Sequence, residues 1–218
     1  MMSNAPERRD CVVIIPMYNE RENAAAVIDA VLALTHLRHV YPRMCSGHTQ
    51  GRLLAMLAAI AQPRRVIELG TFTGYSALCL AENLPEDAEV HTVEIDDEME
   101  PELSELFAAP HPGASVRLHI GDAMDIIPTL PAPWDMAFID ANKRHYCEYY
   151  DLLLPRMRPG GLILADNTLW SGKILHPDAA RDPQTRALLE FNDRVAADTR
   201  VRKVILPVRD GLTLIRVL

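Results

Sequence analysis

Two carboxylates and an amide follow apolar stretches of this chain that we expect to form strands. Asp140 comes directly after residues 136–139, and the pair Asp166-Asn167 comes directly after residues 162–165. In an open parallel sheet the carboxyl ends of the strands line one crevice, so these side chains should converge there. Carboxylate and amide oxygens are suitable ligands for Mg²⁺ or a similar hard cation. The pattern therefore predicts a cation site, although each residue taken singly is also typical of a turn.

A lysine follows the first of these carboxylates closely. Lys143 lies three residues after Asp140 and is near enough to act as a general base on an acceptor hydroxyl. The alternative is a solvated lysine near a helix start. Trp170 could pack on the ring of an acceptor or fill a loop-covered core. Asp210 is more typical of a turn than of a site.

A glycine-containing turn, residues 68–76, joins the first predicted strand to the helix after it. Gly70 allows a tight turn and the close approach of a ligand. The stretch is not a GxGxxG dinucleotide fingerprint, because no glycine stands two positions after Gly70, and it has no GK[ST] motif. An ordinary turn between a strand and a helix is the alternative.

Two further strand ends carry carboxylates. Glu94 ends the second predicted strand, where it could accept hydrogen bonds from both ribose hydroxyls of a nucleoside. Gly121-Asp122 ends the third, where it could contact an adenine edge. A solvated strand-end glutamate and a simple turn are the respective alternatives. Together these positions predict a nucleoside pocket beside the cation site.

The elements that must position these residues alternate regularly from residue 64 onward, which predicts a doubly wound α/β fold. Residues 159–161, Pro-Gly-Gly, should form a turn before the fifth strand. The helix predicted over residues 51–61 is apolar on most sides, which favours a core position first and a dimer contact second. Strands are expected at 65–69, 89–95, 115–120, 134–139 and 162–165, and helices at 75–83, 98–107, 123–130 and 146–154.

The alternation of strands and helices ends near the end of the chain. A helix is predicted over residues 185–197, followed by strands over 203–208 and 212–217. Only Arg209-Asp210-Gly211 separates the two strands, which is typical of a hairpin. The hairpin would add one antiparallel strand to an otherwise parallel sheet of seven strands.

Composition bounds the class of protein. The 218 residues suffice for one domain with a buried core, and 49% hydrophobic with 24% charged residues is typical of a globular chain. A formal charge of −8 argues against nonspecific binding to nucleic acid. The four cysteines are far apart and form no CxxC motif, and no apolar run is long enough for a membrane span. We expect a reduced, cytoplasmic protein with a small-molecule partner and no membrane partner.

Residues 35–218 resemble the cation-dependent class I O-methyltransferases, the group that contains catechol and caffeoyl-CoA O-methyltransferases. The matching segments stand in the family's order and spacing: residues 66–76, 138–143, 165–170 and 209–213. The resemblance implies a class I methyltransferase fold and transfer of a methyl group from S-adenosylmethionine (SAM) to a hydroxyl of a catechol-like small molecule. A divalent cation, with Mg²⁺ as the first choice, would favour the ionised catechol and fix its orientation.

The resemblance also implies roles for individual residues. Asp140, Asp166 and Asn167 would hold the cation, and Lys143 would be the base. Met44 and Ser46 match a segment that wraps the methionine part of SAM. The full set of implied SAM contacts is Met44, Ser46, Glu68, Gly70, Ser76, Glu94, Asp122 and Asp140.

The first 34 residues do not fit that family. Residues 12–34 resemble the opening strand and helix of family 2 glycosyltransferases, but the rest of such a domain is missing. We treat residues 1–34 as an atypical leader and residues 35–218 as the methyltransferase domain. Our hypothesis is that residues 23–34 form a helix that partly replaces the helix that the methyltransferases have in this place.

Other functions stay open on the sequence alone. One alternative is a SAM-binding domain with little or no turnover because of the replaced N-terminus. A nicotinamide-dependent dehydrogenase is disfavoured by the missing GxGxxG motif and by the terminal hairpin. A glycosyltransferase rests only on the leader. The natural acceptor, the choice among Mg²⁺, Mn²⁺ and Ca²⁺, and the question of a homodimer are not decided by these residues.

Overall fold

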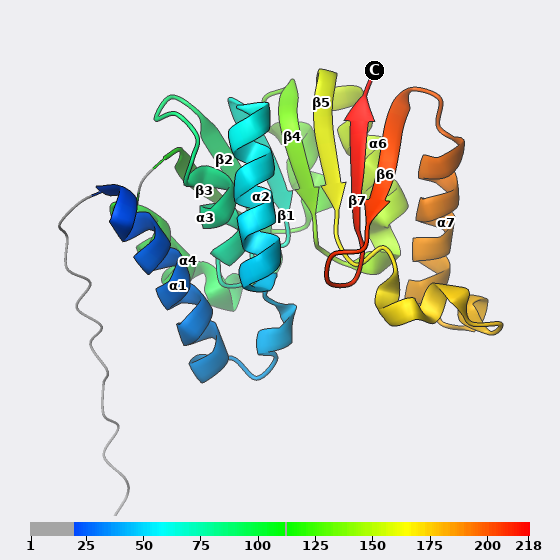
Figure 1. The fold of residues 1–218 in the computed structure, drawn as a ribbon, viewed down its shortest axis with the longest axis horizontal. Coiled ribbons are helices and arrows are strands. Elements are labelled where there is room, and N and C mark those ends of the chain that lie inside the picture. The colour runs from blue at the N-terminus through cyan, green and yellow to red at the C-terminus, as the bar shows by residue number, and fades with distance from the viewer. Residues whose placement is uncertain (1–19, 112) are drawn as a thin grey trace, which may run out of the picture.

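A computed structural model describes residues 20–111 and 113–218 of the chain. Its centre is a seven-stranded sheet of order β3-β2-β1-β4-β5-β7-β6, flanked by helices (Figure 1). β1 to β5 run parallel, and β7 runs antiparallel to both of its neighbours, β5 and β6. The strands are β1 (Arg65–Leu69), β2 (Glu89–Glu94), β3 (Ser115–Ile120), β4 (Trp134–Ile139), β5 (Met157–Ala165), β6 (Val201–Leu206) and β7 (Leu212–Val217). This arrangement confirms the predicted fold class and its single antiparallel strand.

Helices cover both faces of the sheet. α2 and α3 cover one face, α5, α6 and α7 cover the other, and α1 packs on α3 (Figure 1). The helices are α1 (Glu20–Arg38), α2 (Gly47–Ala61), α3 (Tyr75–Ala81), α4 (Glu100–Ala108), α5 (Ala123–Ile126), α6 (Tyr146–Leu153) and α7 (Pro183–Ala197). Short 3₁₀ segments are η1 (Pro42–Met44), η2 (Asp97–Met99), η3 (Ile127–Thr129), η4 (Lys143–His145), η5 (Leu154–Arg156), η6 (Trp170–Leu175) and η7 (Ala179–Arg181).

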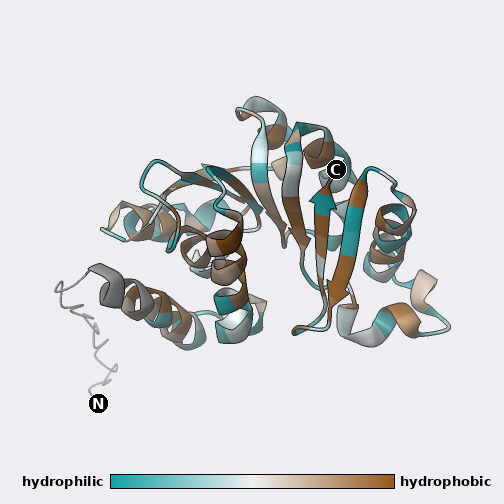
Figure 2. Cartoon of the chain, turned by 45° about the horizontal axis from the view of Figure 1, so that its top comes forward, coloured by the Kyte–Doolittle hydropathy of each residue, from teal (hydrophilic) through white to brown (hydrophobic). Residues whose placement is uncertain are grey.

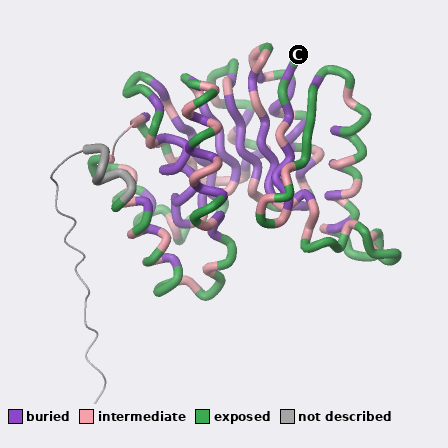
Figure 3. The backbone as a smooth tube through the Cα atoms, viewed as in Figure 1, coloured by how far each residue is buried: buried purple, intermediate pink, exposed green. Residues whose placement is uncertain are grey.

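The central strands are buried on both faces. In β4, Ala137 and Ile139 face the core formed with α6 and α7, whereas Met136 and Phe138 face the core formed with α2 and α3. Side chains of a strand alternate between the two faces, so a strand covered on both sides needs a continuous apolar sequence. Figures 2 and 3 show the apolar, buried character of these strands beside helices of mixed polarity. The apolar runs of the sequence therefore become the inner strands, which end where the site begins.

The structure corrects the predicted turn at Pro159-Gly160-Gly161. β5 begins at Met157, five residues earlier than expected, and Met157 pairs with Trp134 of β4. The register then shifts, because Met136 pairs with Leu162. Gly160 has φ +78°, so this stretch forms a bulge within the strand rather than a turn before it.

The predicted helix in the leader is confirmed and is longer than expected. α1 runs from Glu20 to Arg38, and its buried residues Ile28 and Val31 pack against Tyr75 and Leu78 of α3. The predicted strand near residue 12 lies outside the described residues. Within the described part of the chain, none of the helices has the length and apolar character that a membrane span requires.

Candidate active site

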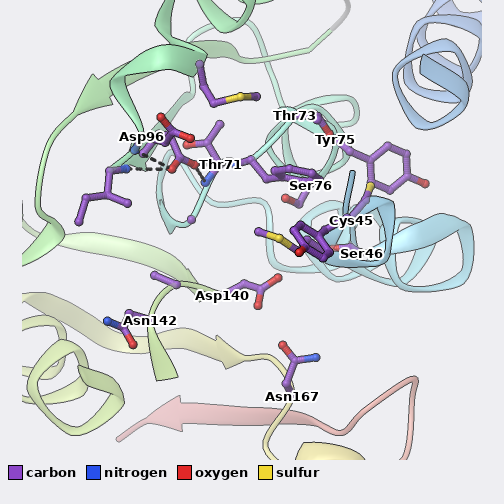
Figure 4. Close-up of a pocket in the computed structure, with 18 of the residues that line it drawn as sticks. Cys45, Ser46, Thr71, Thr73, Tyr75, Ser76, Asp96, Asp140, Asn142 and Asn167 are labelled. Carbon is purple, nitrogen blue, oxygen red and sulfur yellow. Dashed lines mark hydrogen bonds between the residues drawn. The ribbon is translucent and has the colours of Figure 1, made fainter. Parts of the chain in front are cut away.

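A cavity of about 1020 Å³ lies at the carboxyl ends of β1, β2, β4 and β5. The loops after these strands line it, together with the segment from His39 to Ser46 that precedes α2. Figure 4 shows Ser46, Thr71, Ser76, Asp140 and Asn167 around this space. The carboxyl ends of the parallel strands thus bring these predicted side chains to one cavity, as expected.

The turn between β1 and α3 approaches β4 closely at Gly70. Its φ is +96°, and an added Cβ would lie 2.5 Å from the carbonyl oxygen of Asp140. The Gly70 N–H donates to the Val93 carbonyl at 2.9 Å. No side chain fits at position 70, so this glycine is required both by the backbone conformation and by the contact between the two loops.

Main-chain donors surround the carboxylate of Glu94, which is buried at the end of β2. One oxygen accepts from the N–H groups of Thr71 and Phe72, at 3.1 and 2.7 Å. The other accepts from the N–H groups of Ile95 and Asp96, at 2.9 and 3.0 Å. These four bonds occupy the usual acceptor positions of a carboxylate. The β1 and β2 loops are therefore tied together by this one side chain.

Glu68 is a second carboxylate of this region and is fully buried in β1. Thr92 donates to its Oε2 at 2.5 Å, whereas Oε1 has no hydrogen-bond partner within the described structure. Burial raises the pKa of Glu68 to about 8, although the neighbouring hydroxyls of Ser76 and Thr92 oppose this rise. A buried acceptor without a donor fits a positively charged ligand group at this end of the cavity.

Asp140, Lys143 and Tyr146 form a connected group at the end of β4. The Lys143 ammonium donates to Asp140 Oδ1 at 2.7 Å and to the Tyr146 hydroxyl at 2.6 Å. The Tyr146 hydroxyl lies within hydrogen-bond distance of the carbonyls of Ile139 and Asp166, at 3.2 and 3.1 Å. Burial raises the pKa of Asp140 to about 6, Lys143 opposes this rise, and Asp166 adds to it. Lys143 is thus held at the cavity wall by two defined contacts.

Asp166 and Asn167 follow β5. Asp166 is fully buried, its Oδ1 accepts from the Asn167 N–H at 2.7 Å, and its Oδ2 has no hydrogen-bond partner. Asn167 has φ +57° and lines the cavity. Arg209, from the turn between β6 and β7, places Nη1 at 3.6 Å from Asp166 Oδ2.

These residues fit a divalent cation by their chemistry. An unpaired oxygen on a fully buried carboxylate calls for a positive charge, and Asp140 and Asn167 add further hard oxygen ligands nearby. No cluster of three or more His, Cys, Asp or Glu suited to a metal occurs in residues 20–111 and 113–218. Any cation bound here would therefore need the amide of Asn167, water or substrate oxygens besides the two carboxylates.

Most of the predicted site residues reach the cavity. Met44, Ser46, Gly70, Ser76, Glu94, Asp140, Lys143 and Asn167 line it. Glu68 and Asp166 are fully buried and do not line it. The side chain of Asp122 instead caps α5 by accepting from the Met124 N–H at 2.8 Å, while its neighbours Gly121 and Ala123 line the cavity.

Residues outside the predicted set also form the wall. Arg209 is the most consequential, because its sequence position, in a hairpin turn and in a segment that matches the family, did not assign it a role at the site. Trp170 packs against the core, as one of its two alternatives predicts, and it also lines the cavity. Asp210 lies in the turn, as predicted, and does not line the cavity; its carboxylate accepts from the Ser171 N–H in the loop after β5.

Comparison with known proteins gives one consistent result. A sequence profile described as O-methyltransferase matches residues 21–218, and so extends into the segment treated above as a leader. The catechol O-methyltransferase of Niastella koreensis is 34% identical, over 82% of this chain and 83% of that protein. Caffeoyl-CoA O-methyltransferase 2 of Zea mays is also 34% identical, over 82% and 72%. The crystal structure of the O-methyltransferase TomG from Streptomyces achromogenes, in complex with SAM, aligns with a TM-score of 0.78 and 33% identity, over 88% of this chain and 89% of that one.

Proposed function

This chain belongs to the family of SAM-dependent O-methyltransferases, and on this premise we propose that its acceptor is a catechol-like small molecule and that a divalent cation assists the transfer. The observation that carries the proposal is the buried Asp166 Oδ2 without a hydrogen bond, beside Asp140 and Asn167 at the cavity. The relatives named for catechol and caffeoyl-CoA support an aromatic diol as acceptor.

Asp140, Asp166 and Asn167 would hold the cation. When bound, a divalent cation would supply Lewis acidity that favours the ionised form of a catechol hydroxyl and would orient the two oxygens. The three residues would fix the acceptor relative to the sheet, because two of them follow strands buried on both faces. Mg²⁺ is our first choice, and Mn²⁺ and Ca²⁺ are suited to the same oxygen ligands.

Lys143 would remove the acceptor proton. Its Nζ lies at the cavity and is held by Asp140 and Tyr146, so in the neutral form its lone pair would be available to the acceptor hydroxyl. The acceptor oxygen would then attack the methyl carbon of the sulfonium in line. With no covalent enzyme intermediate, the gain in rate would come mainly from positioning the two substrates.

The loops after β1 and β2 would hold SAM. The unpaired Glu68 Oε1 would accept from the ammonium of its methionine part, next to Met44, Ser46 and Ser76. Glu94 would face the ribose hydroxyls, which would have to share the carboxylate with its four main-chain donors. Gly70 would let the ligand approach the backbone closely.

Methyl transfer from labelled SAM to caffeic acid, with Mg²⁺ and with excess EDTA, tests this proposal. We expect turnover with Mg²⁺ that EDTA abolishes. Turnover that is unaffected by EDTA would refute the role of the cation but would still support methyltransferase activity. Normal SAM affinity without transfer to caffeic acid or any other catechol would favour the alternative of a SAM-binding domain with little turnover.

A further inference from the structure

The turn between β6 and β7 carries an arginine in an unusual backbone conformation. Arg209 has φ +53°, a left-handed value that residues other than glycine rarely adopt. Its guanidinium lines the cavity, and Nη1 lies 3.6 Å from Asp166 Oδ2. Nη2 donates to the carbonyl oxygen of Arg43, in the segment before α2. The side chain thus spans from the N-terminal wall of the cavity to the buried carboxylate.

The backbone of this turn is fixed to the loop that carries Asp166 and Asn167. The Thr168 N–H donates to the Gly211 carbonyl and the Leu169 N–H donates to the Asp210 carbonyl, both at 3.0 Å. These bonds hold the Cα of Arg209 beside the predicted cation site. The long side chain is attached to this fixed point and is not fully enclosed, with 29% of its surface exposed. It can therefore change its contacts without a change in the fold.

Both the guanidinium of Arg209 and a divalent cation would be attracted to the carboxylate of Asp166. The carboxylate is fully buried and its Oδ2 lacks a hydrogen bond, so it needs a nearby positive charge. Arg209 supplies that charge in this structure at ion-pair distance. A divalent cation on the same oxygen would meet the guanidinium at close range, where two positive charges repel strongly.

We propose that Arg209 is an internal competitor of the divalent cation: it neutralises Asp166 in the cation-free protein and must leave this carboxylate when the cation binds. The inference rests on the proposed function, because it concerns the same cation site. On this proposal the cation must displace the Arg209 side chain from Asp166. The affinity of the site for the cation therefore depends in part on residue 209.

Calorimetric titration with Mn²⁺, without SAM or acceptor, tests this inference on the full chain. We expect Arg209→Gln to bind Mn²⁺ about tenfold more tightly than the wild type, because the competing charge is removed. Arg43→Gln is the matched control: it removes an exposed positive charge from the wall of the same cavity but keeps the carbonyl that Arg209 contacts. The control should change the affinity by less than about threefold.

Thermal unfolding gives a second readout. The cation-free Arg209→Gln protein should melt at a lower temperature than the wild type, and saturating Mn²⁺ should raise its melting temperature by a larger amount. Arg209→Lys, which keeps the charge on a shorter side chain, should lie between the two and serves if the glutamine variant does not fold without the cation.

The outcomes separate this inference from the proposed function. Equal or weaker Mn²⁺ affinity in Arg209→Gln and Arg209→Lys, with clear binding to the wild type, would overturn the role of Arg209 and leave the cation site intact. An equal gain in Arg43→Gln would also overturn it, since the effect would then be general electrostatics. Absence of Mn²⁺ binding in the wild type and in all variants would refute the cation site itself, and the inference with it.

Discussion

The two halves of the cavity satisfy their carboxylates in different ways. On the β1–β2 side, Glu94 accepts four main-chain N–H groups. On the β4–β5 side, Asp140 and Asp166 lie close to the side chains of Lys143 and Arg209. Main-chain donors are fixed by the fold, whereas long cationic side chains can change their contacts. Glu94 is therefore fixed by the fold itself, whereas on the other side our proposal is that Asp166 exchanges one positive partner for another.

Removing a charge from the β4–β5 side should have the largest effect. Asp166→Asn keeps the shape of the side chain but weakens the proposed cation site, and we expect kcat/KM with Mg²⁺ to fall about a thousandfold. SAM affinity should stay within about threefold of the wild type, because Asp166 is not among the implied SAM contacts. Initial rates and calorimetry check both values. Equal loss of SAM affinity would contradict the separation of the two halves.

The converse change is Glu94→Gln on the β1–β2 side. The amide NH₂ would face two main-chain N–H groups, so the free energy of unfolding should drop by about 2–3 kcal/mol and SAM should bind more weakly. Mn²⁺ affinity should not change. Urea denaturation and calorimetry measure these effects, and Glu98→Gln, which changes an exposed glutamate nearby, is the control. Stability equal to that of the control would show that the four hydrogen bonds are unimportant.

A smaller effect is expected at Tyr146, which positions Lys143. Tyr146→Phe removes the hydroxyl that accepts from Lys143, and we expect kcat to fall about tenfold, the equivalent of one hydrogen bond to a charged group, with little change in SAM or Mn²⁺ affinity. Tyr150→Phe makes the same chemical change on α6 and is the control. The Tyr150 hydroxyl does not line the cavity and donates to Asp198 over a distance of 3.0 Å. If both variants lose the same activity, Tyr146 has no positioning role.

The smallest effect concerns pH and Glu68. Because burial raises its pKa from 4.5 to about 8, the cofactor-free fold should lose stability as the pH rises through this range. Binding of the SAM ammonium favours the ionised carboxylate, so SAM affinity should rise from about pH 6 to about pH 8, with release of a proton. Calorimetry in buffers of different ionisation enthalpy detects that proton. Glu68→Gln should abolish the release, and release that persists in this variant would assign it to another group.

The sequence predicted what depends on local pattern. β1, β4 and β7 have the predicted bounds, because apolar runs between turn residues leave little choice for strands inside a sheet, and the edge strand β3 has its predicted bounds as well. The strand-end rule likewise placed Asp140, Asn167 and Glu94 at one cavity. The Pro-Gly-Gly stretch was misread because a bulge and a turn use the same residues. Arg209 was missed because its contact with Asp166 requires the last turn of the chain to lie beside the loop after β5, which only the folded sheet brings about.

Binding of the two substrates, measured separately with Mg²⁺ and with EDTA, tests whether the cation acts on the acceptor side of the cavity alone. Calorimetric titration with SAM should give affinities within about threefold of each other in the two conditions, because Asp140 alone among the implied SAM contacts is also a proposed cation ligand. Titration of caffeic acid into protein saturated with S-adenosylhomocysteine should show binding with Mg²⁺ and none with EDTA. Binding of caffeic acid that EDTA leaves unchanged, or SAM binding that EDTA removes, would contradict the account.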